Sequence, residues 1–158
     1  MIQAISQTNF DAFIETKANK ITNLGSAQIR HLVKFINDLD EAVFYAYPLN
    51  EIIYNRYTLM PFIYNSTPDR YVGKIALIPA GYYKYEVYEV SWIGAVVVAL
   101  NTAPATETDV LPVADANGVV EGLVAIGKLY LAEKAGSEEV QYTEYEAPKT
   151  TNTIYYGQ

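Results

Sequence analysis

One stretch of nine residues, Gly81–Glu89, constrains the fold more than any other part of the chain. Within it, Tyr83, Tyr85 and Val87 alternate with more polar neighbours. Successive side chains of a strand point to opposite faces, so this alternation predicts a β-strand with one buried and one wet, aromatic face. The residues expected on the wet face are Tyr82, Lys84, Glu86 and Tyr88. Ile78–Gly81 predicts the preceding turn, because proline fixes φ and glycine tolerates positive φ.

Further short strands, separated by turns, are expected along most of the chain. Gln28–Ile36 and Ala42–Tyr47 flank a polar turn and predict a β-hairpin. Tyr54–Tyr64 is β-rich, and its Pro61 restricts that strand to a sheet edge or a bulge. The remaining expected strands cover residues 10–15, 73–77 and 128–133, and for the first of them a short helix capped by Thr8 is the alternative.

Trp92–Leu100 is the most apolar run of the chain. It is far shorter than the roughly 20 residues of a membrane-spanning helix. It therefore predicts a strand that is apolar on both faces, at the centre of a sheet or under a partner. Residues 101–117 are rich in Thr, Pro and Ala and predict an exposed loop that folds over a neighbour, and Asn117-Gly118 indicates a type I′ turn.

Seven or eight short strands with turns between them are typical of an all-β fold, a single β-sandwich of jelly-roll or immunoglobulin-like type with extended arms. At 158 residues the chain is long enough for one domain with one core. We expect residues 1–25 to form an N-terminal arm or edge strand. Residues 26–134 then form the sandwich with the 101–117 loop as an insertion, and residues 135–158 form a C-terminal arm.

The charge balance bears on possible partners. The formal net charge is −7, which argues against nucleic-acid binding, because phosphate contacts need clustered Lys and Arg. The acidic character also disfavours anionic membranes. Cysteine is absent, so disulfides, thiolate catalysis and Cys-ligated zinc are excluded. The first residues have no basic or long apolar segment, and we expect a protein made in a cytoplasm without a signal peptide.

Candidate catalytic and metal-binding residues are few. His31, the single histidine, lies in an expected strand with no nucleophile or orienting carboxylate beside it in the sequence, so a structural role is expected. Asp38, Asp40 and Glu41 lack the spacing and the central glycine of a calcium loop and predict a solvated turn. No catalytic residue, cofactor or metal site is therefore expected.

Exposed aromatic residues offer one binding hypothesis. Tyr82, Tyr88 and Trp92 could form a platform on which sugar rings stack, as in lectin-like sandwiches. Tyr-rich strands also pack against sister subunits, because tyrosine suits interfaces that are half buried and half wet. A carbohydrate- or receptor-binding module is the functional alternative that these residues support.

Several segments together resemble a known group of proteins. They are His31–Asp38, Phe44–Ala46, Asp69–Tyr71, the Pro-Ala-Gly turn with Tyr82–Glu89, Glu121–Leu129, Tyr142–Tyr145 and a Tyr-Tyr terminus. Over about residues 28–158 the chain resembles the small β-sandwich virion proteins of tailed phages of Bacteroidetes hosts, the crAss-like phages among them. Relative to that pattern, residues 101–116 are an insertion.

The resemblance implies a non-enzymatic virion subunit, most simply a neck or head–tail connector ring protein, with capsid decoration as a second position. Its partners would be copies of itself and the portal, tail or capsid proteins, with no nucleic acid or membrane. It would be made in the host cytoplasm and reside in the virion. Extended, β-prone arms can add a strand to a neighbouring sheet. The residues expected at this assembly interface are Val140, Tyr142, Tyr145, Ile154, Tyr155 and Tyr156.

Overall fold

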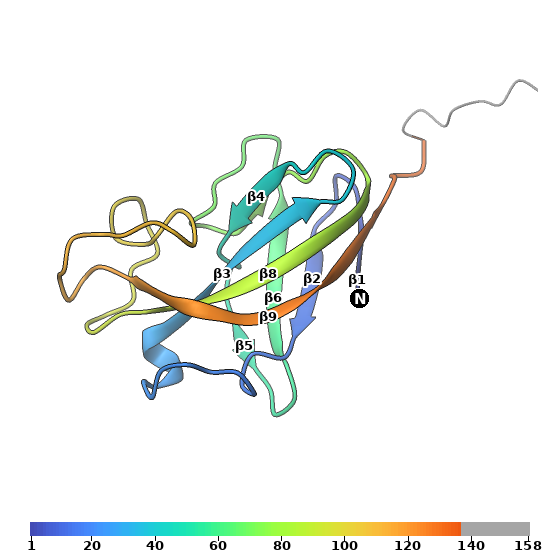
Figure 1. Cartoon of the computed structure of the whole chain (residues 1–158). Helices are drawn as coiled ribbons and strands as arrows, with labels where there is room; N and C mark the ends of the chain where they lie inside the picture. The colour runs from blue at the N-terminus through green and yellow to red at the C-terminus, as the bar shows by residue number, and fades with distance from the viewer. Residues whose placement is uncertain (137–158) are drawn as a thin grey trace, which may run out of the picture.

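Two β-sheets packed face to face make up the protein in the computed structural model, which describes residues 1–136 (Figure 1). Among these residues there is no α-helix, and the prediction of an all-β sandwich is confirmed. The elements are β1 (Ile2–Ile5), β2 (Phe10–Ile14), the 3-10 turn η1 (Ser26–Gln28), β3 (Ile29–Asn37), β4 (Val43–Ala46), β5 (Ile52–Ile53), β6 (Thr58–Tyr64), β7 (Lys74–Ile75), β8 (Gly81–Ser91) and β9 (Val119–Ala132).

The larger sheet has five strands in the order β1-β9-β8-β3-β4. Its middle strand, β8, pairs antiparallel with β3 from Ile29↔Ser91 to Asn37↔Tyr83, and on its other side with β9. The predicted hairpin is confirmed, because β3 and β4 are antiparallel neighbours. β1 lies at one edge, parallel to β9. The Gly81–Glu89 stretch therefore forms the centre of the sheet.

The smaller sheet has the order β2-β6-β5, and β7 pairs with β6 beyond the end of β5. Pro61 thus lies on a middle strand, so the edge-strand prediction is wrong for β6 as a whole. At Pro61 itself no strand lies on the β5 side. There its carbonyl accepts a hydrogen bond from the Leu49 N–H at 2.9 Å. Because the nitrogen and oxygen of one strand residue point to the same side, the missing N–H costs the β2–β6 ladder nothing.

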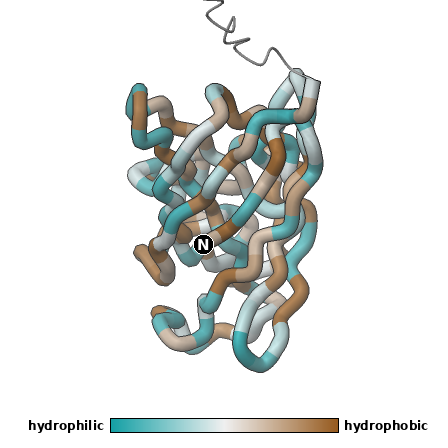
Figure 2. Tube along the Cα trace, turned by 90° about the vertical axis from the view of Figure 1, so that its right-hand side faces the viewer, coloured by the Kyte–Doolittle hydropathy of each residue, from teal (hydrophilic) through white to brown (hydrophobic). Residues whose placement is uncertain are grey.

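The main core lies between the sheets and follows the alternation along β8. Tyr83, Tyr85 and Val87 point inward and are buried, while Tyr82 on the opposite face is 56% exposed, as predicted. Figure 2 shows the same interleaving of apolar and polar residues along the chain. The inward residues of the other strands add aliphatic side chains and three mutually packed rings, Phe10, Phe35 and Phe62.

Residues 1–25 contribute one edge strand to each sheet. β1 borders the larger sheet, and β2 borders the smaller one through its antiparallel pairing with β6. The strand interpretation of residues 10–15 is therefore confirmed over the short-helix alternative. The Thr8 side chain donates to the Ile5 carbonyl at 2.7 Å, within the tight connection between the two strands.

The apolar run after β8 does not form the predicted strand. Segment 92–118 contains no strand, and the chain leaves the ladder directly after Ser91. Trp92 turns onto the outer face of the larger sheet, where it packs in a second cluster of buried residues, namely Leu32, Tyr47, Val90 and Ala103. The prediction failed because the outer face near Leu32 is itself apolar. The run covers this face as a loop rather than extending the sheet.

The predicted type I′ turn at Asn117-Gly118 is also wrong. Such a turn needs positive φ at both central residues, and neither residue has it. The glycine is required for another reason. A Cβ on Gly118 would lie 2.7 Å from Cζ2 of Trp92, so the backbone passes directly against the indole ring.

A second close contact, between the Tyr85 ring and the backbone of Gly127, allows a test of the core packing. Tyr85 lies opposite Gly127 on β9, and its ring occupies the space that a Cβ on Gly127 would need. We expect Gly127→Ala to lower the free energy of unfolding by about 1–3 kcal/mol, because a methyl group would overpack the site. Urea denaturation measures the change. Gly25→Ala is the control, since nothing lies within 4 Å of that position; equal effects of the two substitutions would contradict the packing.

Candidate functional site

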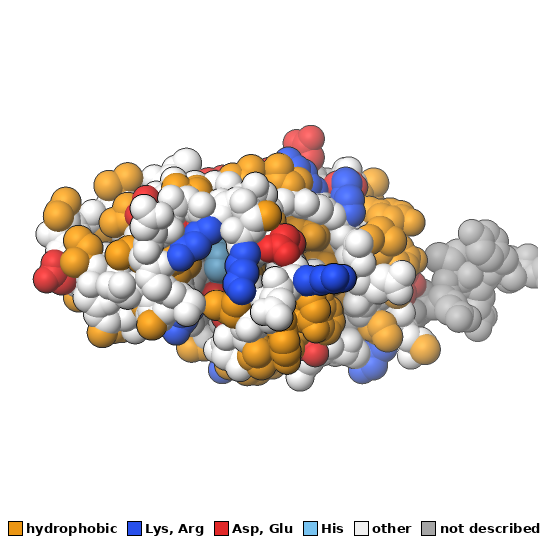
Figure 3. Space-filling view, turned by 90° about the horizontal axis from the view of Figure 1, so that it is seen from below, with side chains coloured by type: hydrophobic (Ala, Val, Ile, Leu, Met, Phe, Trp, Pro, Cys, Tyr) orange, Lys and Arg blue, Asp and Glu red, His pale blue; other side chains and the backbone are white. Residues whose placement is uncertain are grey.

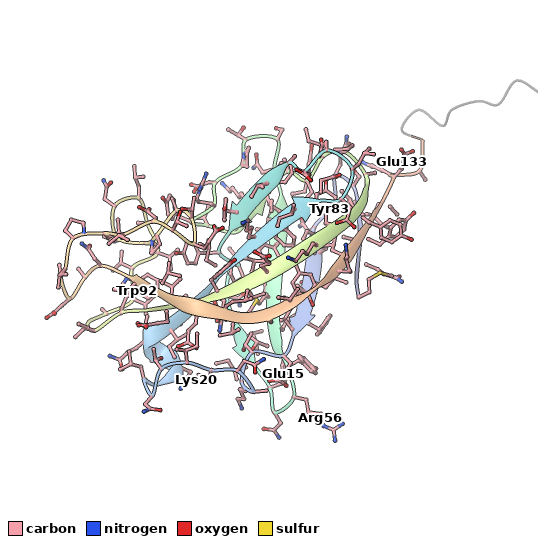
Figure 4. All side chains as sticks on the ribbon, in the orientation of Figure 1. Glu15, Lys20, Arg56, Tyr83, Trp92 and Glu133 are labelled. Carbon is pink, nitrogen blue, oxygen red and sulfur yellow. The ribbon has the colours of Figure 1, made fainter. Side chains whose placement is uncertain are left out.

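The predicted aromatic platform does not form. Trp92 is 0% exposed, and its Nε1–H donates to the Thr102 carbonyl at 3.2 Å. Tyr88 is half-buried, with its hydroxyl donating to Glu86 Oε2 at 2.7 Å. Only Tyr82 is freely exposed, and its ring lies 4.9 Å from that of Tyr130. Figure 4 shows Trp92 at one end of β8 and Tyr83, the neighbour of Tyr82, at the other. The three rings therefore do not form one exposed platform.

The predicted C-terminal interface lies outside the described residues. It comprises Val140, Tyr142, Tyr145, Ile154, Tyr155 and Tyr156, all of which follow residue 136.

The first half of the 101–117 loop folds over its own sheet, which corrects the expectation of an exposed loop covering a neighbour. Glu107 holds it there: its carboxylate accepts from Lys34 Nζ at 2.5 Å and from the Tyr45 hydroxyl at 2.6 Å. Two backbone carbonyls add further contacts, accepting from Tyr47 Oη at 2.8 Å and from the Arg70 guanidinium at 2.7 Å. Strands β3 and β4 and the 65–74 loop thus fasten this segment to the outer face.

The charge of Glu107 depends on these contacts. Burial acts to raise its pKa, but the hydrogen bonds from Lys34 and Tyr45 outweigh burial and lower the pKa below its usual value of 4.5. Glu86 on the same face has a lowered pKa as well, because Lys84 and Tyr88 donate hydrogen bonds to it.

This lowered pKa predicts how stability changes with pH. A carboxyl group whose pKa falls on folding stabilises the protein above its unfolded pKa, and that contribution is lost as pH falls through the folded pKa. We expect Glu107→Gln to cost about 1–2 kcal/mol of unfolding free energy at pH 7 and to reduce the loss of stability between about pH 5 and 3. Urea midpoints across this pH range measure both effects. Asp115→Asn, on the exposed part of the same loop, removes one charge without touching the Glu107 contacts and should leave the urea midpoint at pH 7 unchanged.

Away from the contacts of Glu107, the 92–118 segment and the first residue of β9 carry exposed aliphatic side chains. We call this region the apolar loop end; it projects from one end of the sandwich (Figure 1). Each of its members is at least 45% exposed, and they are Ile93, Val97, Leu100, Val110, Val113 and Val119. Scattered apolar side chains are normal on protein surfaces, but several on one projecting segment make that segment a candidate interaction surface.

A cavity of about 380 Å³ opens at the end of the sandwich where β2 ends and β3 begins. His31 on β3 lies at its base. The backbone N–H of His31 donates to Glu51 Oε1 at 2.7 Å, and its Nδ1 lies 2.8 Å from Glu51 Oε2. Both side chains are buried, with 7% and 4% of their surfaces exposed. In Figure 3 the histidine is visible at the bottom of a hollow, with cationic side chains on either side of it and an anionic group beyond one of them.

Glu89 on β8 is the second carboxylate of this cavity, directly across the ladder from His31. It is 1% exposed and accepts three hydrogen bonds, from the backbone N–H groups of Ile21 and Thr22 and from the Thr22 hydroxyl. Burial acts to raise the pKa of Glu89, but these donors and the nearby His31 outweigh it and lower the pKa. Glu89 thereby anchors the loop that follows β2.

No sequence pattern indicated the His31–Glu51 pair. Glu51 lies 20 residues further along the chain, just before the short edge strand β5, and only the packing of one sheet on the other brings it to His31. An imidazole held by a carboxylate can move a proton, but a catalytic dyad also needs a nucleophile. Among residues 1–136 no hydroxyl bonds to the imidazole, whose side-chain partner is Glu51.

The described part of the chain lacks two other kinds of feature. No group of three or more His, Cys, Asp or Glu residues is arranged to hold a metal ion. No helix in residues 1–136 has the length and apolar character needed to cross a membrane.

Comparison with known proteins found no matching family model, curated protein or solved structure.

Proposed function

We propose that the protein is a non-enzymatic structural subunit that assembles into a larger particle through the apolar loop end. The observation that carries this proposal is the exposure of six aliphatic side chains on the 92–118 segment and the first residue of β9. The same segment buries Trp92 and Ala103 against its own sheet, so the loop is anchored while its outer side stays apolar. An anchored apolar surface loses little conformational freedom when a partner covers it.

The shape of the molecule supports a head-to-tail arrangement. The apolar loop end and the end of β9 near Glu133 lie at opposite ends of the sandwich (Figures 1 and 4). The Tyr-rich residues 137–158 follow Glu133 in the sequence. If they bind the apolar loop end of the next copy, the contact joins two different surfaces. Repeated contacts of this kind generate a ring or a filament.

The resemblance to virion proteins of tailed phages supports a phage virion as the particle into which the protein assembles. A neck or head–tail connector ring is the first position that we propose, because a head-to-tail contact closes rings; capsid decoration is the second. The partners in either position are copies of the chain and the portal, tail or capsid proteins. The burial of Trp92 removes the aromatic platform, so no specific observation favours the carbohydrate-binding alternative.

Charge at the apolar loop end should block assembly. We expect the double substitution Val110→Asp/Val113→Asp to weaken self-association or particle incorporation by at least about 10-fold, because each buried aliphatic anchor contributes on the order of 1 kcal/mol or more. Both side chains are fully exposed, so the fold should be unaffected. Sedimentation velocity measures self-association, and quantitative mass spectrometry of purified particles measures incorporation.

The matched control is Leu39→Asp, an equally exposed aliphatic position on the β3–β4 turn, away from the apolar loop end. It should assemble like the unmodified chain. If the double variant also assembles normally, the apolar loop end is not the contact and the proposed function loses its main support.

Removal of residues 147–158 tests the other half of the contact. All strands found in the described part of the chain end by Ala132, so the truncated chain should fold and show the same urea midpoint. We expect it to remain monomeric and to be absent from particles. Normal particle occupancy of the truncated chain would contradict a role for this segment in assembly.

A further inference from the structure

The His31 cavity is built from buried charged groups that the assembly role does not use. Its base is formed by His31 and Glu89 from the larger sheet and by Glu51, next to the smaller one. All three side chains are more than nine-tenths buried. Hydrogen bonds from Ile21, Thr22 and His31 compensate the buried carboxylates. Because these charged groups also line an open cavity, the cavity is the candidate ligand site of the described residues.

The imidazole presents an unused atom to this cavity. A carboxylate can only accept, so the Nδ1 atom that faces Glu51 carries the proton. In the neutral ring Nε2 is then a hydrogen-bond acceptor. Within residues 1–136 this atom has no hydrogen-bond partner, although His31 is buried and lines the cavity.

The base of the cavity is therefore acidic and rich in acceptors. With both glutamates ionised, the three side chains carry net negative charge whether the imidazole is neutral or protonated. The hydrogen bonds to Glu51 and Glu89 leave lone pairs free on their carboxylate oxygens. Two lysines, Lys17 and Lys20, also line the cavity, but both are exposed at its mouth, where solvent screens their charge.

The walls suit an aliphatic stem. Ile29 and Ile53 line the cavity between its acidic base and its mouth. Beyond Ile53, the β5–β6 hairpin carries two packed tyrosine rings, Tyr54 and Tyr57, and the second of these packs edge-on against the exposed Phe13. An apolar patch therefore lies next to the residues that line the mouth.

We propose that this cavity binds one alkyl-ammonium or alkyl-guanidinium group. The cationic head donates hydrogen bonds to Glu89, Glu51 and Nε2 of His31, and the methylene stem packs between Ile29 and Ile53. A small amine or the side chain of a Lys or Arg in a partner chain can supply this chemistry. The inference does not rest on the proposed assembly through the apolar loop end, because the site lies on a different part of the molecule and is complete in one copy.

The single histidine makes the test specific. In the full-length chain labelled with ¹⁵N, the imidazole nitrogens of His31 are the only ones in the spectrum. Agmatine and n-butylammonium are added as cationic probes, and butyrate and n-butanol as an anion and a neutral molecule with the same stem length. We expect the cations to shift the Nε2 resonance saturably and to hold the ring in the form protonated on Nδ1. The butyrate and butanol titrations should leave it unchanged.

Two neighbouring substitutions give a matched control. Ile53→Lys places a positive charge in the lining of the cavity, whereas Ile52→Lys alters the preceding residue of the same exposed edge strand, which does not line it. We expect Ile53→Lys to weaken agmatine binding at least about 10-fold and Ile52→Lys to leave it unchanged. Because both positions are exposed on β5, the two variants should fold alike. Glu89→Gln should weaken binding to a similar extent by removing a charged acceptor.

The opposite results would overturn the proposal. A folded chain whose His31 signals do not respond to either cation up to about 10 mM has no such site at useful affinity. Equal or stronger binding of butyrate would mean that the lysines build an anion site instead. Unchanged agmatine affinity in both Ile53→Lys and Glu89→Gln would place the binding elsewhere.

A final comparison separates the two sources of the cation. The affinity of agmatine is compared with that of a blocked peptide that has neutral flanking residues, acetyl-Leu-Gly-Arg-Gly-Leu-amide. Tighter binding of the peptide supports a partner chain that also contacts the Phe13–Tyr57 patch. Tighter binding of agmatine supports a free small amine.

Discussion

The pairing of β8 on both of its sides is the interaction on which the rest of the structure depends. It joins β3 along nine residue pairs and β9 along its full length, so every other strand of the larger sheet is placed relative to it. Its alternating side chains then decide which face meets the second sheet. Tyr83 and Tyr85 point into the core, and the glycine opposite Tyr85 gives this ring its space.

The larger sheet is apolar on both faces at one end, and this explains the long loop after β8. Leu32 and Val90 face away from the second sheet, and Trp92 covers them together with Ala103. The ion pair between Glu107 and Lys34 and the hydrogen bonds around it then hold the loop down. A loop fixed in this way can keep its conformation while it exposes aliphatic side chains on its outer side. This property suits the proposed interaction surface.

A different chemistry is found between the sheets where β2 ends and β3 begins. There His31, Glu51 and Glu89 form the base of a cavity whose walls include Ile29 and Ile53. Glu89 satisfies its oxygens by holding the loop after β2, and Glu51 does so by binding the backbone and ring of His31. The arrangement leaves charge and an acceptor atom directed at a cavity. The loop after β8 is thus apolar and protruding, whereas the cavity near the start of β3 has charged groups at its base.

Local patterns were enough to predict the all-β class, the alternation of β8 and the β3–β4 hairpin, because these depend on side-chain period and on neighbouring turns. They misled at Trp92–Leu100, where an apolar run can equally form a strand or cover a sheet face, and at Gly118, whose role is close contact with an indole ring that comes 26 residues earlier in the chain.

Most strands and the faces that they bury could be read from the order of apolar and polar residues. The position of the loop after β8 and the carboxylates that meet His31 depend instead on how the two sheets pack. The physical reason is that Glu51 and Glu89 stand 20 and 58 positions from His31, and no local preference brings them together. The packing of the two sheets alone creates that site.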